Sequence, residues 1–119
     1  MRQGELSPRP APSMVCLAQK FIREHADGEF RLADIAAAVH ASPRTLQYAF
    51  ARQGTTPMRY LRDVRLAHAH QELCDACCGA GGPRTVAEVA RRWHFSNPGR
   101  FAAAYLRLYG QLPRRTLRR

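Results

Sequence analysis

The chain has 119 residues, and its 19 Lys and Arg residues outnumber 9 Asp and Glu residues for a formal net charge of +10. This length is enough for one modest core, or for two small halves that share one element. No apolar run approaches the roughly 18 residues that cross a bilayer, so we expect a cytoplasmic protein without a membrane segment. The charge predicts a polyanionic partner, because each cation set against a phosphate releases condensed counterions.

Residues 1–13 carry three prolines and no apolar core. This composition is unlike a signal peptide and predicts a disordered tail or an interdomain linker. The next segment, from about Ser13 to Ala26, has apolar residues at helical spacing, and Asp27-Gly28 ends it. We expect this helix to close the core of the first half.

A short helix, a tight turn and a second helix are predicted between residues 32 and 54. The turn falls at His40-Ala41, where the helical apolar pattern of the preceding residues stops. Ser42 is a good N-cap, and Pro43 suits the first helical position because its missing N–H costs nothing there. The second helix has a buried stripe that ends before Gly54 and consists of Leu46, Ala49 and Phe50.

A long helix is predicted from Thr56-Pro57 to about Ala76. Its apolar residues form two overlapping sets, which are Met58, Leu61 and Val64, followed by Leu66, Ala69 and Leu73. This drift indicates a helix that packs on one half of the chain at its start and on the other half at its end. Residues 77–84 are rich in glycine and are predicted to form a loop.

The second half has the same organisation as the first. Thr85 and Glu88 form a capping box at the start of a short helix. Its predicted apolar face consists of Val86, Val89, Ala90 and Trp93. Asn97-Pro98 opens the following helix, and Gly110 ends it. The inner face of that helix is predicted to be Phe101, Ala104, Tyr105 and Leu108, and a last short helix over 113–118 closes the second core.

An internal repeat supports this division. His40 and Ser42 match His94 and Ser96 at an offset of 54 residues, so one supersecondary unit is used twice. We predict an all-α fold of about seven helices. Two helix-turn-helix subdomains, at 14–56 and 85–119, are joined by a linker helix at 57–76 and a loop at 77–84.

Three segments together resemble the DNA-binding domain of the AraC/XylS family of bacterial regulators, over residues 14–118. Residues 42–57 resemble the first recognition helix and its exit, and residues 60–69 resemble the linker helix. Residues 86–113 resemble the second motif. The family usually has glycine at the position of His94, so we expect a left-handed backbone there. Members usually carry a separate sensor domain, and we expect that effector domain to be absent from this chain.

The resemblance implies a sequence-specific transcription regulator that activates transcription. Its implied partners are double-stranded DNA and RNA polymerase. We expect no cofactor, no metal and no catalytic residue. A recognition helix presents its N-terminal outward residues to base edges in the major groove. The candidates for base reading are Pro43, Arg44, Gln47, Tyr48, Gly99, Arg100 and Ala103. Candidates for phosphate contacts are Arg52, Thr56, Thr85, Arg92, Asn97, Arg107 and Arg114.

The two recognition helices are predicted to contribute unequally. Arg44 suits the O6 and N7 atoms of guanine and Gln47 suits adenine, whereas Arg100 is the only strong base reader on the second helix. We therefore expect the first unit to supply most of the sequence discrimination. Two different helices entering successive major grooves, about 34 Å apart, predict an asymmetric target of about 20 base pairs.

Three other classes of protein are alternatives to this interpretation. No Ser-His-Asp order, phosphate-binding glycine loop or paired carboxylates stand out, and no acidic partner of the five histidines is identifiable, so an enzyme is not expected. His94 and the Ala-rich second recognition helix would also suit a protein-interaction module of the same fold that reads no DNA. His70, Cys74, Cys77 and Cys78 would suit a thiol- or zinc-sensing regulator, although reduced thiols without a ligand are the default in a cytosolic protein.

Overall fold

Seven helices follow one another along the part of the chain that the computed structural model describes, residues 13–79 and 85–118. They are α1 (Met14–His25), α2 (Leu32–Ala38), α3 (Pro43–Ala51), α4 (Pro57–Cys77), α5 (Val86–Arg92), α6 (Pro98–Tyr109) and α7 (Pro113–Arg118). No strand occurs within these ranges, which confirms the all-α prediction. The expected tail, apart from Ser13, and most of the expected loop at 77–84 lie outside the described residues.

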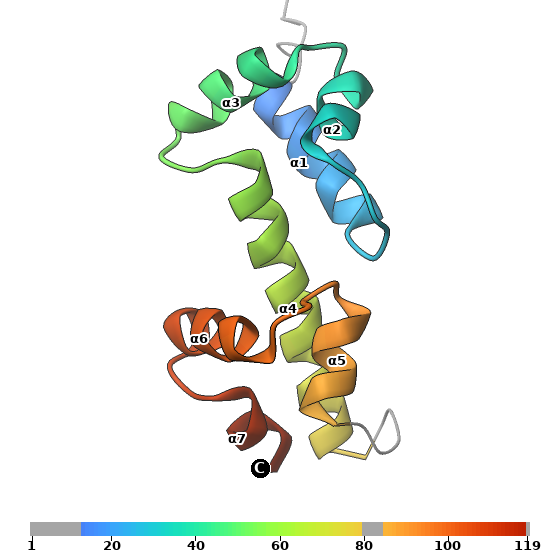
Figure 1. The fold of residues 1–119 in the computed structure, drawn as a ribbon, viewed down its shortest axis with the longest axis vertical. Coiled ribbons are helices and arrows are strands. Elements are labelled where there is room, and N and C mark those ends of the chain that lie inside the picture. Colours follow the sequence, from blue (N-terminus) through green and yellow to red (C-terminus); the bar gives the residue numbers. More distant parts are fainter. Residues whose placement is uncertain (1–12, 80–84, 119) are drawn as a thin grey trace, which may run out of the picture.

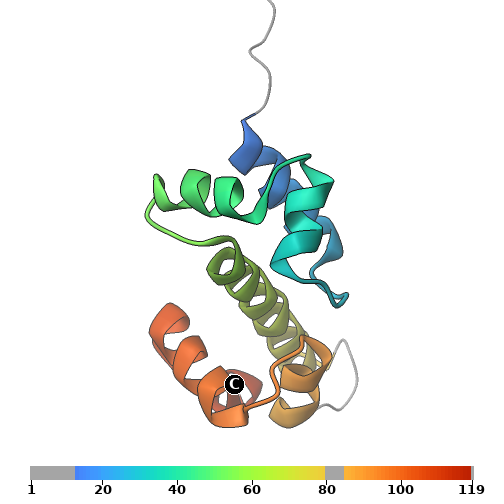
Figure 2. The ribbon, with the colours of Figure 1, turned by 45° about the horizontal axis from the view of Figure 1, so that its top comes forward.

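The long helix α4 joins two groups of helices (Figure 1). Helices α1 to α3 lie at its first half, where α1 and α3 contact it, and α5 to α7 lie at its second half, where α5 and α7 contact it most. Both ribbon views place α3 and α6 on one side of α4, with α2 and α5 on the other side (Figures 1 and 2). The second helices of the two helix-turn-helix units therefore share one side of the molecule.

Local capping sets where most of these helices begin. The first turn of a helix leaves backbone N–H groups without partners, and a short polar side chain can accept from one of them. The Ser42 hydroxyl accepts from the N–H of Thr45 at 3.1 Å, and the Thr56 hydroxyl accepts from Arg59 at 3.1 Å. Thr85 and Glu88 cap each other's backbone N–H groups, at 3.1 and 2.8 Å. This is the capping box that the sequence predicts.

The recognition helix of the first unit packs its apolar stripe against α1 and α2, and that of the second packs against α5 and α7. Leu46 and Phe50 of α3 are fully buried, as are Phe101 and Tyr105 of α6. Further buried residues come from every other helix, and they include Ile22, Ile35, Leu61, Leu66, Ala69, Leu73, Val89 and Trp93. The aromatic residues of the second unit thus belong mainly to its core.

Three of the apolar residues predicted to pack in the cores are instead exposed. The exposed fraction is 44% for Leu17 of α1, 41% for Met58 and 49% for Leu108. Tyr109, one residue after Leu108, packs on the ring of His70 with the ring centroids 4.0 Å apart. In the last turn of α6, Tyr109 therefore faces the core in place of the predicted Leu108. Met58 borders a surface hollow described below.

The turns of both units contain a histidine with a left-handed backbone. His40 has a φ of 56° and His94 has a φ of 67°. The expectation for His94 is confirmed, and the repeat places His40 at the matching position of the first unit. Such a conformation is costly for a residue with a Cβ atom, so both turns carry strain.

The loop after α1 contacts both the linker helix, through Arg65, and the second unit, through His94. The Nε and a terminal nitrogen of Arg65 donate to the carbonyl oxygens of Ala26 and Gly28, at 2.9 and 2.7 Å. The Nε2 of His94 donates to the carbonyl oxygen of Asp27 at 2.7 Å, and its Nδ1 lies 3.8 Å from the Glu29 carboxylate. One histidine thus has the acidic neighbour that sequence analysis did not identify. Burial lowers the pKa of the Arg65 guanidinium, and the charge of Glu29 opposes that effect.

Candidate nucleic-acid interface

Helix α3 presents a polar N-terminal face on the opposite side from its buried stripe. Its four predicted base readers, Pro43, Arg44, Gln47 and Tyr48, are all exposed. The Tyr48 ring is the most notable, because 69% of this large side chain is open to solvent. An exposed aromatic ring beside an arginine and a glutamine offers both stacking and hydrogen-bonding groups to a base edge.

Helix α6 presents a flatter surface. Gly99, Arg100 and Ala103 are exposed, as the prediction requires of base readers, but only Arg100 carries a hydrogen-bonding side chain. The Oδ1 of Asn97 accepts from the backbone N–H of Arg100 at 3.0 Å and so fixes the first turn. A Cβ atom at Gly99 would lie 3.3 Å from that same oxygen, which leaves little room for a side chain between cap and helix.

The predicted phosphate contacts are all exposed, but they are placed differently. Arg52, Thr56, Asn97, Arg107 and Arg114 flank or belong to α3, α4, α6 and α7. Thr85 and Arg92 belong to the start and end of α5, on the other side of α4 from α6 (Figures 1 and 2). Arg92 also lies 3.4 Å from the Glu72 carboxylate, so part of its charge is already balanced within the protein.

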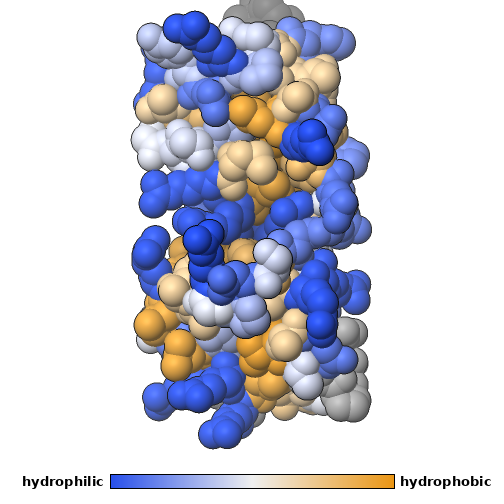
Figure 3. Space-filling view, viewed as in Figure 1, coloured by the Kyte–Doolittle hydropathy of each residue, from blue (hydrophilic) through white to orange (hydrophobic). Residues whose placement is uncertain are grey.

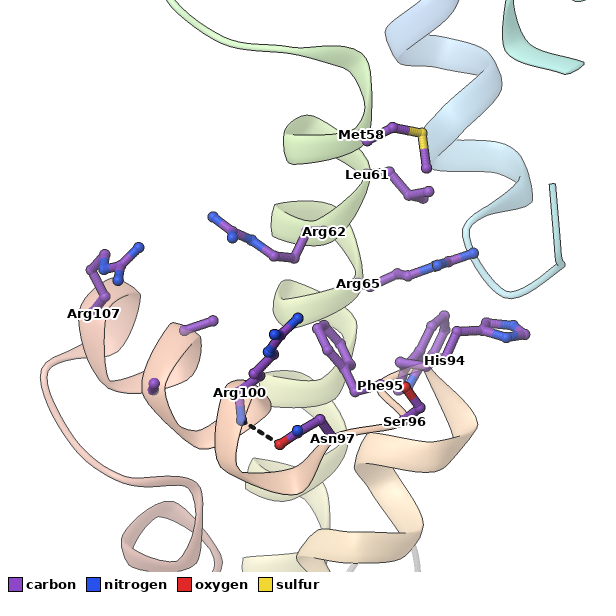
Figure 4. A pocket seen from close by; sticks show the side chains of 13 residues that line it. Met58, Leu61, Arg62, Arg65, His94, Phe95, Ser96, Asn97, Arg100 and Arg107 are labelled. Carbon is purple, nitrogen blue, oxygen red and sulfur yellow. Dashed lines mark hydrogen bonds between the residues drawn. The ribbon is translucent and has the colours of Figure 1, made fainter. Parts of the chain in front are cut away.

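A surface hollow of about 460 Å³ lies between α4 and α6, where it touches the turn before α6 (Figure 4). Its lining contains four arginines and no acidic residue. The lining residues are Met58, Leu61, Arg62, Arg65, Trp93, His94, Phe95, Ser96, Asn97, Arg100, Ala103, Ala104 and Arg107. Sequence analysis assigned no binding role to Arg62 or Arg65 of this set, because the outward positions of a linker helix look like ordinary solvated surface.

The charges on this side are largely unbalanced. Within the described residues, the side chains of Arg44, Arg100 and Arg107 have no acidic partner, whereas Arg65 and Arg92 are held by internal contacts. Hydrophilic side chains cover much of the middle of the molecule in the same view as Figure 1 (Figure 3). A surface with several uncompensated guanidinium groups attracts phosphate-bearing polymers.

The histidine and cysteine residues of α4 are used for packing. The Nδ1 of His70 lies 2.6 Å from the hydroxyl of Tyr105, which also bonds the hydroxyl of Thr116 at 2.7 Å. The sulfur of Cys74 lies 3.7 Å from the other ring nitrogen of His70. No group of three or more potential metal ligands is assembled anywhere in residues 13–79 and 85–118. Nor does any helix in these ranges have the length and apolar character needed to cross a membrane.

Comparison with known proteins identifies the fold. Residues 35–119 match the family model of a helix-turn-helix domain. The crystal structure of a probable AraC family transcriptional regulator from Rhodopseudomonas palustris CGA009 superimposes with a TM-score of 0.80. The two are 32% identical, over 87% of this chain and 94% of that chain. The chain belongs to the AraC/XylS family. The matched region is the helix-turn-helix DNA-binding domain of that family.

Curated relatives of this AraC/XylS domain are regulators of operons. The probable thc operon regulatory protein of Rhodococcus erythropolis is 39% identical over 113 residues, which are 93% of this chain and 33% of that protein. The XylDLEGF operon transcriptional activator 1 of Pseudomonas putida is 34% identical over 116 residues, which are 97% of this chain and 34% of that protein. The chain therefore spans about a third of the length of these relatives.

Proposed function

We propose that this chain binds double-stranded DNA sequence-specifically and acts in transcription regulation in the bacterial cytoplasm. The observation that carries the proposal is the placement of α3 and α6 on one side of α4, each with its N-terminal outward residues exposed. A helix with that exposure fits the major groove, where base edges differ in their donors and acceptors. The regulatory relatives support the same role.

The two helices are proposed to enter successive major grooves on one face of the duplex. The linker helix has 21 residues and is therefore about 31 Å long, on the order of the 34 Å between successive grooves. Because α3 and α6 carry different side chains, the target of a single chain is expected to be asymmetric and about 20 base pairs long. Arg44, Gln47 and Tyr48 are proposed to read one half-site, and Arg100 with Gly99 and Ala103 the other.

The relatives also suggest whether the chain activates or represses transcription. Relatives in Pseudomonas putida are transcriptional activators. We propose that this chain likewise activates transcription by contact with RNA polymerase. The phosphate candidates position α3 and α6 without reading bases, because phosphate contacts fix register and carry no direct sequence information.

The test is selection of bound duplexes from a random pool at near-physiological salt. Wild type is compared with Arg44→Ala, Arg100→Ala and, as a matched loss of one positive charge, Lys20→Ala, which lies on α1. We expect two blocks of enriched sequence about one helical turn apart. Arg44→Ala should blur one block and Arg100→Ala the other, by about 1–3 kcal/mol of discrimination at one base pair. Lys20→Ala should leave both blocks intact.

The outcome distinguishes the alternatives. Absence of any enriched sequence, with binding that depends only on charge, would refute the proposal and leave a protein-interaction module of the same fold. A weaker sequence preference in the block read by α6 than in the block read by α3 would match the small number of base-reading side chains on α6. Equal information in both blocks would contradict the expected asymmetry between the two units.

A further inference from the structure

Two arginines of α4 border the hollow, and they point to opposite sides (Figure 4). Arg65 extends toward the loop after α1, where two carbonyl oxygens hold it at 2.9 and 2.7 Å. Arg62 extends toward the side of α6, where Arg100 and Arg107 also lie. Arg65 is therefore occupied by the loop after α1, whereas Arg62 points to the side of α4 on which α6 lies.

One nitrogen of the Arg62 guanidinium, the Nε, lacks a hydrogen-bond acceptor. This nitrogen is buried, and the described residues offer it no hydrogen-bond partner. A carboxylate oxygen of the adjacent Asp63 lies 3.8 Å from that nitrogen, which makes an ion pair but is too far for a hydrogen bond. The side chain as a whole is 39% exposed, so an external group can reach the rest of the fork.

The surroundings of Arg62 favour an anion. The hollow is lined by Arg62, Arg65, Arg100 and Arg107, and no acidic residue lines it. A planar guanidinium with several donors binds a phosphate through two parallel hydrogen bonds. The hollow has room for such a group beside the fork, since its volume is about 460 Å³.

The position of the hollow indicates which part of the DNA backbone would supply the phosphate. It lies on the side of α4 that carries α6, and α3 lies on that same side (Figures 1 and 4). When two helices occupy successive major grooves, the DNA between them turns its minor groove and the two flanking backbones toward the middle of the protein. We propose that Arg62 binds a backbone phosphate of this spacer and so anchors the duplex between the two half-sites.

This inference rests on the proposed DNA-binding function and adds a contact outside both recognition helices. A phosphate contact positions the duplex and is indifferent to base identity. Arg62 therefore should contribute equally to binding of every site, whatever the half-site sequences. Its contribution should depend on salt, because the contact releases one set of condensed counterions.

The experiment is a double-mutant cycle between protein and DNA. Wild type and Arg62→Ala are measured on the selected duplex and on duplexes in which single spacer phosphates are replaced by uncharged methylphosphonates. We expect one replacement that weakens wild-type binding but has no further effect on Arg62→Ala. Effects that add at every spacer phosphate would overturn the proposal, because they would show no direct contact.

Salt titration supplies a second readout. Removal of one phosphate contact lowers the slope of the logarithm of the binding constant against the logarithm of the salt concentration by about 0.9. The ratio of the wild-type affinity to that of Arg62→Ala should therefore fall about 3.5-fold between 50 and 200 mM salt. Arg62→Lys should retain the slope, and the distant Lys20→Ala should not change it. An unchanged slope in Arg62→Ala would count against the contact.

The outcomes separate this inference from the proposed function. Wild-type selectivity for two half-sites, with additive effects in the cycle, would leave the function standing and remove the role of Arg62. Wild-type binding without any sequence preference would remove the function itself, and the spacer contact with it. The melting temperature of Arg62→Ala serves as a check on folding, and a marked drop would assign Arg62 to stability instead.

Discussion

His40 and His94 occupy equivalent left-handed positions, and replacing each with glycine should have opposite effects. A left-handed backbone costs an L-residue about 1–2 kcal/mol, and glycine removes that cost. Glycine also loses about 0.5–1 kcal/mol more conformational entropy on folding. The difference predicts that His40→Gly, at φ 56° on an exposed turn, stabilises the protein by about 0.5 kcal/mol.

His94→Gly gains the same relief but loses a contact between the two units. Its Nε2 donates to the Asp27 carbonyl oxygen at 2.7 Å, and the ring lies beside Glu29. A hydrogen bond contributes about 1 kcal/mol net. We therefore expect His94→Gly to destabilise the protein by about 0.5 kcal/mol, so that the two variants differ by about 1 kcal/mol.

The measurement is the free energy of unfolding from urea titrations followed by circular dichroism, with wild type and both variants in one buffer. Equal slopes against denaturant are required, because a changed slope would mean a changed denatured state. If His94→Gly stabilises the protein as much as His40→Gly does, the bond to Asp27 contributes nothing. The loop after α1 would then be held mainly by the linker-helix residue Arg65.

Two further predictions concern the second unit. Thr85→Ala should lower the free energy of unfolding by about 1 kcal/mol, because the reciprocal cap with Glu88 is lost, and an unchanged urea midpoint would contradict this. Burial raises the pKa of Tyr105 above the ordinary value of 10.0, with the Thr116 hydrogen bond opposing it, and burial also raises the pKa of Tyr109. Because the folded state then holds these protons more tightly, their stabilisation is fully present below pH 10 and is lost as pH rises through the raised values. Unfolding free energies measured from pH 8 to 12 should fall more steeply for wild type than for Tyr105→Phe, and parallel curves would count against this assignment.

Local signals in the sequence predicted the helices well, for physical reasons that act over a few residues. The caps at Ser42 and Thr85, and the glycine at 110 with its φ of 75°, depend only on neighbouring backbone groups. Apolar spacing predicted the buried stripes of α3 and α6, because a helix of 3.6 residues per turn places those positions on one face. The pattern failed at Leu108 and Met58, where spacing alone does not say how far the neighbouring helices extend.

The candidate interface was predicted only in part. Exposure of Arg44, Gln47 and Arg100 follows from their positions opposite the buried stripes, and that exposure is present in the structure. Arg62 carried no such signal, because its neighbours on α4 alternate between two packing faces. Arg92 was predicted to contact a phosphate, and only the fold brings it within 3.4 Å of Glu72, 20 positions earlier in the chain.

The sequence by itself thus determined the repeat, the helices with their caps, and the two cores, since each arises from contacts over short separations. Only the tertiary structure decided how the two units are joined. Arg65 reaches carbonyl oxygens 39 and 37 positions away, and His94 reaches one 67 positions away. Every residue has a backbone carbonyl, whatever its side chain. The residue type of an acceptor therefore does not indicate that its carbonyl is bonded. The shared side of α3 and α6, and the hollow between α4 and α6, depend on this long-range arrangement.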